Sequence, residues 1–222
     1  MYNFVFESES KRYRSWCSRI LTIVRDTLRE EDIITQFSLV GSGSRNMIMR
    51  NGDGPYDLDY NLEILSMPSD YSSNLHRLKE LIRVTLNNAC DVTLPFSDAK
   101  DSTSVLTSLF HFDDKQSVEF SFDVAIVTRN KNGDLCRLIH NKTARGFGPQ
   151  GQFVWNEVPD SRGVHDKATF IKDQGKWQQV RDCYRDKKNH YLETHDNNHP
   201  SFIVYVEAVN EIYQKLKGGK RK

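Results

Sequence analysis

The sequence has only four cysteines in 222 residues, and they lie far apart. Cys17, Cys90, Cys136 and Cys183 therefore lack the close spacing of a zinc site or a dithiol redox motif. A chain of 25.8 kDa can bury a sizeable core, so it needs no disulfide framework. We expect the four cysteines to be reduced thiols that pack as small apolar side chains.

Long apolar runs and an excess of one charge are also missing. Charged residues interrupt the N-terminal MYNFVFESESKRYRS, and no stretch approaches the ~20 apolar residues of a membrane helix. The 31 Lys and Arg residues balance 30 Asp and Glu residues, so net charge selects no partner. The composition, 37% hydrophobic and 27% charged, is typical of a globular protein, and no internal repeat or low-complexity linker is evident. We expect a cytoplasmic protein without membrane segments.

Hydrophobic periodicity predicts the elements of the first half of the chain. Residues 8–31 carry apolar side chains at three- and four-residue steps, which predicts a helix with one buried face. DIITQFSLVGSGS is a β-prone run that ends in glycines, and residues 57–65 alternate between acidic or amide and apolar side chains. A second amphipathic helix is expected from Asp70, as N-cap, to about Cys90.

Further strands and then helices are expected in the second half. Two β-rich runs, residues 102–112 and 116–128, are joined through Asp113 and Asp114, which indicate a hairpin turn. Asn132-Gly133 predicts another turn with a strand after it. From about residue 150 helical spacing dominates, with a last helix that opens near Pro200. The sum predicts an α+β fold: a mixed or antiparallel sheet with flanking helices in residues 1–148, and a helical part in residues 149–222 packed on this core.

Three aspartates are the candidate catalytic residues. Asp57 and Asp59 lie two residues apart on one face of a strand, about 6.6 Å along the chain at ~3.3 Å per residue. Asp123 lies on the polar face of the strand at residues 116–128, which points the same way if the strands are neighbours. Gathered carboxylates repel one another, and hard cations such as Mg²⁺ or Mn²⁺ remove that penalty. The plain alternative is the solvated face of an antiparallel sheet.

A glycine-serine loop precedes these acids. Gly41 leaves the backbone N–H groups open to an anion, and Ser42 adds a hydroxyl donor, so the loop is suited to phosphate oxygens. A simple turn would use the same residues. Arg45 follows three positions after Ser42 and is either a phosphate contact or a surface cation.

The order Val40-Gly41-Ser42, Arg45-Asn46, Asp57-Leu58-Asp59 and Phe122-Asp123-Val124 resembles the signature of the polymerase-beta-like nucleotidyltransferase superfamily. The resemblance covers roughly residues 33–128. The loop serine can be aligned as Ser42 or Ser44, and we prefer Ser42 because minimal members often carry an arginine three positions later. RNGDGPY is a glycine-rich insertion where compact members have a shorter helix, so the resemblance assigns no nucleotide contact to Asn46 or Arg50.

The resemblance implies transfer of a nucleoside monophosphate from a nucleoside triphosphate such as ATP to a hydroxyl acceptor, with release of pyrophosphate. Asp57 and Asp59 would hold two Mg²⁺ or Mn²⁺ ions and Asp123 would complete one of them, while Gly41, Ser42 and Arg45 would bind the nucleotide. The acceptor is left open between a small molecule, a protein, an RNA end and a second nucleotide. Two alternatives stand beside this: an inactive nucleotide- or RNA-binding regulator, and a toxin-antitoxin or defence component that modifies a partner protein.

Other chemistry-bearing residues are expected to be structural. Glu63 and Glu119 are interpreted as charges at the rim of the site rather than as metal ligands. Cys183, His190, His195 and His199 have irregular spacing in polar surroundings, DKKNHYLETHDNNHP, which favours an exposed loop over a zinc site.

Overall fold

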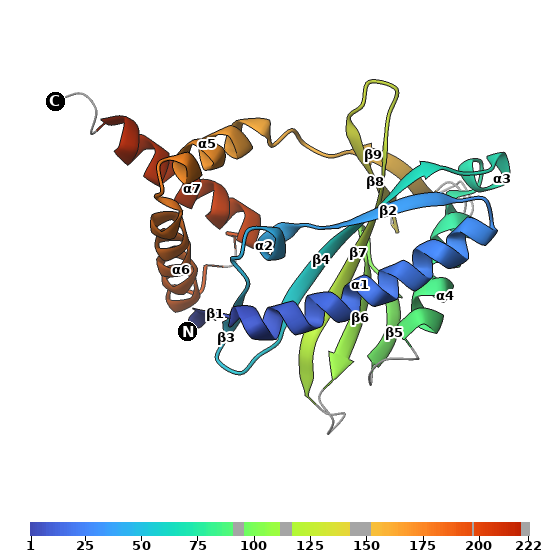
Figure 1. The fold of residues 1–222 in the computed structure, drawn as a ribbon, viewed down its shortest axis with the longest axis horizontal. Helices are drawn as coiled ribbons and strands as arrows, with labels where there is room; N and C mark the ends of the chain where they lie inside the picture. The colour runs from blue at the N-terminus through green and yellow to red at the C-terminus, as the bar shows by residue number, and fades with distance from the viewer. Residues whose placement is uncertain (91–95, 112–116, 143–151, 197, 219–222) are drawn as a thin grey trace. The chain divides into compact units, whose positions relative to one another are not determined.

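The computed structural model describes residues 1–90, 96–111, 117–142, 152–196 and 198–218 (Figure 1). The chain divides into two compact units. The larger comprises residues 5–48 and 54–158, and the smaller comprises residues 1–4, 49–53 and 159–222. The predicted fold class is confirmed: a mixed sheet with flanking helices is followed by a helical C-terminal part. The predicted domain division after residue 148 stays a prediction.

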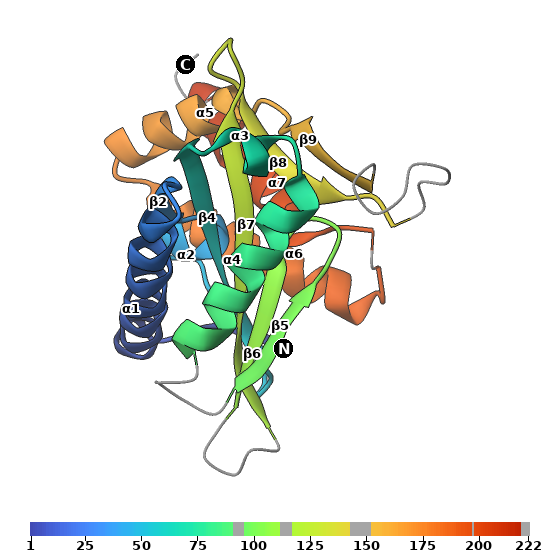
Figure 2. The ribbon, with the colours of Figure 1, turned by 90° about the vertical axis from the view of Figure 1, so that its right-hand side faces the viewer.

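The larger unit is built on a seven-stranded mixed sheet (Figure 2). The strand order is β2-β4-β7-β6-β5, while β8 pairs with β7 and β9 pairs with β8. The central pair, β4 and β7, is parallel, and the other neighbours are antiparallel. The strands are β2 (Ile34–Leu39), β4 (Tyr56–Ser66), β5 (Phe96–Asp101), β6 (Leu106–His111), β7 (Val118–Arg129), β8 (Leu135–His140) and β9 (Phe153–Glu157).

One face of this sheet packs against two long helices, α1 (Glu7–Glu30) and α4 (Leu75–Cys90). The alternation predicted for β4 is confirmed, because Leu58, Tyr60, Leu62 and Ile64 are all buried in the core. Apolar side chains of α1 and α4 join the same core as Phe120 and Phe122 of β7. The acidic side chains of β4 therefore lie on the face away from these helices.

Three local expectations need correction. Asp70 does not cap α4: it lies in the short α3 (Ser69–Ser72), and Asn74 Oδ1 accepts the Arg77 N–H at 3.0 Å instead. Strand β5 escaped prediction because FSDAKD is polar, as suits an edge strand paired only with β6. Strand β9 falls where helices were expected, and the first C-terminal helix begins only at Arg162. The turn predicted at Asp113 and Asp114 lies outside the described residues.

The smaller unit contains a two-stranded sheet and three helices. Strand β1 (Tyr2–Phe4) pairs antiparallel with β3 (Met49–Asn51), and the helices are α5 (Arg162–Asp173), α6 (Trp177–Glu193) and α7 (Ser201–Gly218). The Asn189 side chain joins β1 to α6, because its Oδ1 accepts the Tyr2 N–H at 2.6 Å and its Nδ2 donates to the Tyr2 carbonyl at 3.1 Å. The last helix begins directly after Pro200, close to its predicted start.

The histidine-rich segment is partly helical, contrary to the loop expected from its polarity. Helix α6 continues to Glu193 and includes Cys183 and His190. The ring of His199 stacks on Tyr191 with centroids 3.9 Å apart, and its Nδ1 lies 3.2 Å from Asp196. Three of the four cysteines, Cys17, Cys90 and Cys136, are buried thiols as predicted. In the part of the chain that the structure describes, the longest helices are too short or too polar to cross a bilayer.

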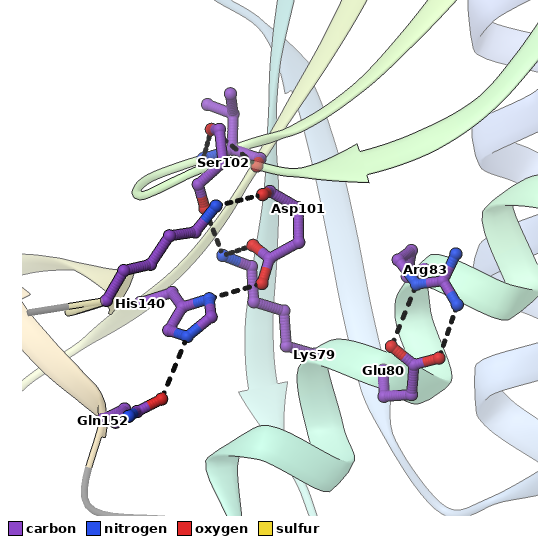
Figure 3. Close-up of polar contacts among 9 residues, drawn as sticks. Lys79, Glu80, Arg83, Asp101, Ser102, His140 and Gln152 are labelled. Atoms are coloured by element: carbon purple, nitrogen blue, oxygen red, sulfur yellow. Dashed lines mark hydrogen bonds and ion pairs between the residues drawn. The ribbon is translucent and has the colours of Figure 1, made fainter. Parts of the chain in front are cut away.

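A buried ion pair ties α4 to the sheet in the larger unit (Figure 3). The Lys79 side chain is only 2% exposed, and its Nζ lies 2.6 Å from Asp101 Oδ1 and donates to the Ser102 carbonyl at 3.1 Å. The other oxygen of Asp101 is 2.6 Å from His140 Nδ1 on β8. Burial raises the pKa of Asp101, but the hydrogen bonds and charges of Lys79 and His140 together outweigh burial and hold that pKa below its usual range. Helix α4 and strands β5 and β8 thus share one charged contact.

Candidate active site

The three candidate carboxylates lie on one face of the sheet, which we call the carboxylate face. In the parallel pairing of β4 with β7, Asp59 is opposite Asp123 and Asp57 is opposite Ser121. Paired residues of neighbouring strands point to the same face. The tertiary structure therefore brings together acids that are 64 positions apart in the sequence, as the predicted cluster requires.

Two hydroxyl groups orient the outer members of this cluster. Ser121 Oγ donates to Asp57 Oδ1 at 2.6 Å, and Thr107 Oγ1 of β6 donates to Asp123 Oδ1 at 2.6 Å. No sequence pattern singles out Thr107, because its place opposite Asp123 depends on the register of β6 with β7. Short bonds of this kind fix carboxylate rotamers, so each acid keeps one oxygen outside the bond.

The cluster carries strong electrostatic strain, which is greatest at Asp59. Burial, followed by the charges of Asp123 and Asp57, raises the pKa of Asp59 to about 6. The guanidinium groups of Arg137 and Arg45 oppose this rise. Burial also raises the pKa of Asp123, although the Thr107 hydrogen bond works against it. Charged groups held at such a cost to the folded state are typical of functional sites.

The raised pKa of Asp59 has a consequence for stability. The folded state binds this proton more tightly than the unfolded state, whose aspartates titrate near ~4. Protonated Asp59 therefore adds to the free energy of unfolding, and this stabilising contribution is fully present below about pH 4 and is lost as pH rises through about 6. In EDTA, we expect Asp59→Asn to gain stability over the parent between pH 4 and 7, by on the order of 2 kcal/mol. Thermal unfolding of both proteins across this range checks it, and a constant difference would contradict it.

The glycine-serine loop packs directly on Asp59. Strand β2 ends at Leu39, the Val40 N–H donates to the Asp59 carbonyl at 2.9 Å, and the chain turns into α2 (Gly41–Ser44). Gly41 has φ +62°, and a Cβ built on it would lie 2.3 Å from Asp59 Oδ2. Glycine is favoured at this position, because the backbone has a positive φ and because a Cβ would displace the Asp59 carboxylate. The loop and the acids are thus parts of one site.

The two possible loop serines differ in their contacts. The hydroxyl of Ser44 donates to the Gly41 carbonyl at 3.1 Å and so closes its own turn. Across the described residues the hydroxyl of Ser42 has no such bond, so it remains available to a ligand. These contacts favour Ser42, in agreement with the preferred alignment. Its role, like that of Gly41 and Arg45, stays a prediction.

Replacing Gly41 by alanine should damage the site more than the fold. Alanine at positive φ costs about 1–2 kcal/mol, and its Cβ would push the Asp59 carboxylate aside. Gly133 is a matched control, because it has φ +85° and open space where an alanine Cβ would lie. We expect Gly41→Ala and Gly133→Ala to lose similar stability in urea unfolding, while only Gly41→Ala loses nucleotide binding in calorimetry. Equal binding by both variants would contradict this.

The carboxylates match a hard divalent cation in chemistry, because oxygen donors are what Mg²⁺ and Mn²⁺ prefer and a cation would relieve the repulsion around Asp59. Within the described ranges, however, no three His, Cys, Asp or Glu side chains already stand close enough to form a metal site. The hydrogen bonds from Ser121 and Thr107 hold Asp57 to the neighbouring strand β7 and Asp123 to the neighbouring strand β6. Glu63 is engaged elsewhere, since it accepts from Gln36 at 2.9 Å and pairs with Arg129 at 2.9 Å.

Comparison with solved structures identifies the architecture. Over 93% of this chain and 68% of the other, the structure superposes on the Vibrio cholerae cyclic AMP-GMP synthase DncV with a TM-score of 0.63 and 10% identity. The chain has the nucleotidyltransferase fold. The nucleotidyltransferase CdnC of E. coli MS115-1, solved with ATP, matches with a TM-score of 0.55 and 16% identity over 95% of this chain and 62% of the other. Both belong to the polymerase beta-like nucleotidyltransferase superfamily, so the resemblance noted in the sequence is confirmed at the level of fold.

Structural similarity, and not overall sequence similarity, identifies the nucleotidyltransferase fold. No protein-family model matches the sequence, and no curated protein matches it. A third neighbour, E. coli DncV with 3'-deoxy GTP, has a TM-score of 0.53 and 13% identity over 93% of this chain. The chain spans 68%, 62% and 53% of the lengths of the three neighbours, so it is shorter than each of them.

Proposed function

We propose that this protein is a metal-dependent nucleotidyltransferase that moves a nucleoside monophosphate from a nucleoside triphosphate to a hydroxyl acceptor and releases pyrophosphate. One observation carries the proposal: Asp59 lies opposite Asp123 on one sheet face, and Gly41 packs against the Asp59 carboxylate. A solvated sheet face has no need of a glycine at positive φ against a half-buried acid. The arrangement instead joins a phosphate-binding loop to a cation-binding cluster.

The proposed roles follow from the position of each residue. Asp57, Asp59 and Asp123 would hold two Mg²⁺ or Mn²⁺ ions, which when bound neutralise charge on the phosphates and lower the pKa of the attacking hydroxyl. The backbone N–H groups at Gly41 and Ser42 would orient the triphosphate beside Asp59. Ser121 and Thr107 keep the carboxylates of Asp57 and Asp123 in place before substrate arrives. Such preorganisation supplies much of the acceleration in phosphoryl transfer.

The ligands of the structural neighbours support a nucleoside triphosphate as the donor and favour one class of acceptor. CdnC was solved with ATP, and DncV was solved with a linear intermediate, 5' pppA(3',5')pG. A second nucleotide is therefore the acceptor that we favour over a small molecule, an RNA end or a protein. CdnC was also solved in complex with HORMA-deltaN, which supports the alternative in which this chain acts on a partner protein. A cytoplasmic location would suit such chemistry.

The proposal is tested by incubating the purified chain with each nucleoside triphosphate, alone and in pairs, in Mg²⁺ or Mn²⁺. Pyrophosphate release measures transfer, and mass spectrometry of the products identifies the acceptor. We expect release that EDTA abolishes, with a product heavier by one nucleoside monophosphate. Calorimetric binding of triphosphate without release in any mixture would favour the regulator instead. A mass increment on a co-expressed protein would favour modification of a partner.

A further inference from the structure

Two buried polar atoms on the carboxylate face lack hydrogen-bond partners among the described residues: Nε of Arg137 and Oδ1 of Asn61. Asn61 follows Asp59 by two positions on β4, so it points to the same face. Arg137 on β8 is opposite Val127, which lies four positions after Asp123 on β7 and on the same face. The two orphaned atoms therefore lie on the same face as the three acids, further along the strands.

The Asn61 side chain lies between small residues of the two neighbouring strands. Asn61 is opposite Ala125 on β7 and opposite Ser38 on β2, so two small side chains flank it. Ala125 offers only a methyl group between the positions of Asp123 and Val127. Buried polar groups in folded proteins are nearly always hydrogen-bonded, so these two unsatisfied atoms require a partner, which a ligand can supply.

Arg129, a second arginine on the same face, differs from Arg137 because its guanidinium has fixed partners. Arg129 is paired with Glu63 at 2.9 Å and donates to the Gly133 carbonyl at 3.0 Å. The Arg137 side chain makes no hydrogen bond and no ion pair with the described residues. Its guanidinium still acts on the site, because its charge opposes the rise in the pKa of Asp59. The Arg137 guanidinium therefore already acts electrostatically on one carboxylate of the site, that of Asp59.

A partly buried guanidinium without a fixed partner costs free energy, and an incoming anion removes that cost. A phosphate group suits the planar fork of an arginine, which donates two parallel hydrogen bonds. The Asn61 oxygen requires a donor, which a hydroxyl or amino group next to the phosphate would provide. A nucleotide carries both kinds of group.

We propose that Arg137 and Asn61 form a phosphate-binding subsite beside the three aspartates. The inference deepens the proposed function and rests on it for the identity of the substrate. The phosphate would come either from the donor triphosphate or from an acceptor nucleotide, and both share the same chemistry. Arg137 is a substrate-binding residue here, placed by its strand register with β7.

Calorimetry in Ca²⁺ tests the subsite with four probes: inorganic tripolyphosphate, ATP, AMP and adenosine. The variant is Arg137→Gln, and Arg129→Gln is the matched control that removes an equal charge from the same face. We expect Arg137→Gln to weaken binding of at least one phosphate-bearing probe about tenfold or more, and Arg129→Gln to change it less than about twofold. Loss with tripolyphosphate and ATP assigns the subsite to the donor, whereas loss confined to AMP assigns it to an acceptor nucleotide.

Several results would overturn the subsite. These are unchanged binding of every phosphate probe, an equal loss for adenosine, an equal loss in Arg129→Gln, or no binding of any phosphate probe by the parent. If Arg137→Gln fails to fold by thermal unfolding, Arg137→Lys takes its place, because it keeps the charge but loses the fork; unchanged affinity there would also count against the subsite. The outcome is independent of turnover: a parent that binds but never releases pyrophosphate refutes the proposed function and leaves the subsite standing.

Discussion

Asp59→Asn should reduce nucleotidyl transfer at least about 100-fold while the protein unfolds at an equal or higher temperature at neutral pH. The side chain lies at the centre of the carboxylate cluster, opposite Asp123 and against Gly41. Asparagine keeps its shape but removes the charge that would hold a cation. Removing that charge also removes the burial cost and the repulsion that together raise the pKa of Asp59, so activity and stability should move in opposite directions. Pyrophosphate release and calorimetric unfolding measure the two effects.

Glu63→Gln is the control for this variant. Glu63 lies on the same face of the same strand, but its carboxylate already accepts a hydrogen bond from Gln36 and pairs with Arg129. We expect its transfer rate to stay within about threefold of the parent, because it neither faces Asp123 nor contacts the loop. An Asp59→Asn protein that transfers nucleotide as fast as the parent would defeat the proposed active site. A large loss in Glu63→Gln would show that the assay responds to any charge on this face.

Lys79→Met should lower the free energy of unfolding by about 3 kcal/mol, which is the largest stability effect that we expect from a charged residue. The substitution keeps the apolar stem of the side chain but leaves Asp101 without its 2.6 Å partner. Asp101 is 27% exposed and still has His140, so water and protonation of the pair limit the cost. Urea unfolding monitored by circular dichroism gives the value.

Two further variants separate the buried charge from general disruption of α4. Arg83→Met removes a cation one turn later on the same helix, where it pairs with Glu80 near the surface, and should cost less than about 1 kcal/mol. Combining Lys79→Met with Asp101→Asn should recover part of the loss, because no unpaired charge is then buried. If the double variant is as unstable as the sum of its two single variants, the loss does not come from the ion pair.

Local patterns in the sequence predicted much of the larger unit. The helix expected over residues 8–31 is α1, and the alternation over residues 57–65 is β4, because burial of one face imposes a period that is legible in any single segment. The polar edge strand β5 and the three-residue strand β1 lack that signal, because an edge strand buries little and three residues are too few to show a period. The helix cap at Asn74 was not predicted for a different reason: several polar residues near residue 70 are suitable N-caps, and the sequence does not distinguish among them.

For the candidate site, too, the sequence determined some features and the tertiary structure determined others. The sequence by itself determined which residues could carry the chemistry: a glycine-serine loop, two aspartates two positions apart and a third on a β-prone run. Only the tertiary structure decided that Asp59 and Asp123 are opposite in a parallel pair, that Gly41 touches Asp59, and that Arg137 stands unpaired among the described residues of the same face. Strand pairing is the reason, because register between distant segments depends on how whole sheet faces pack, which no local stretch of sequence encodes.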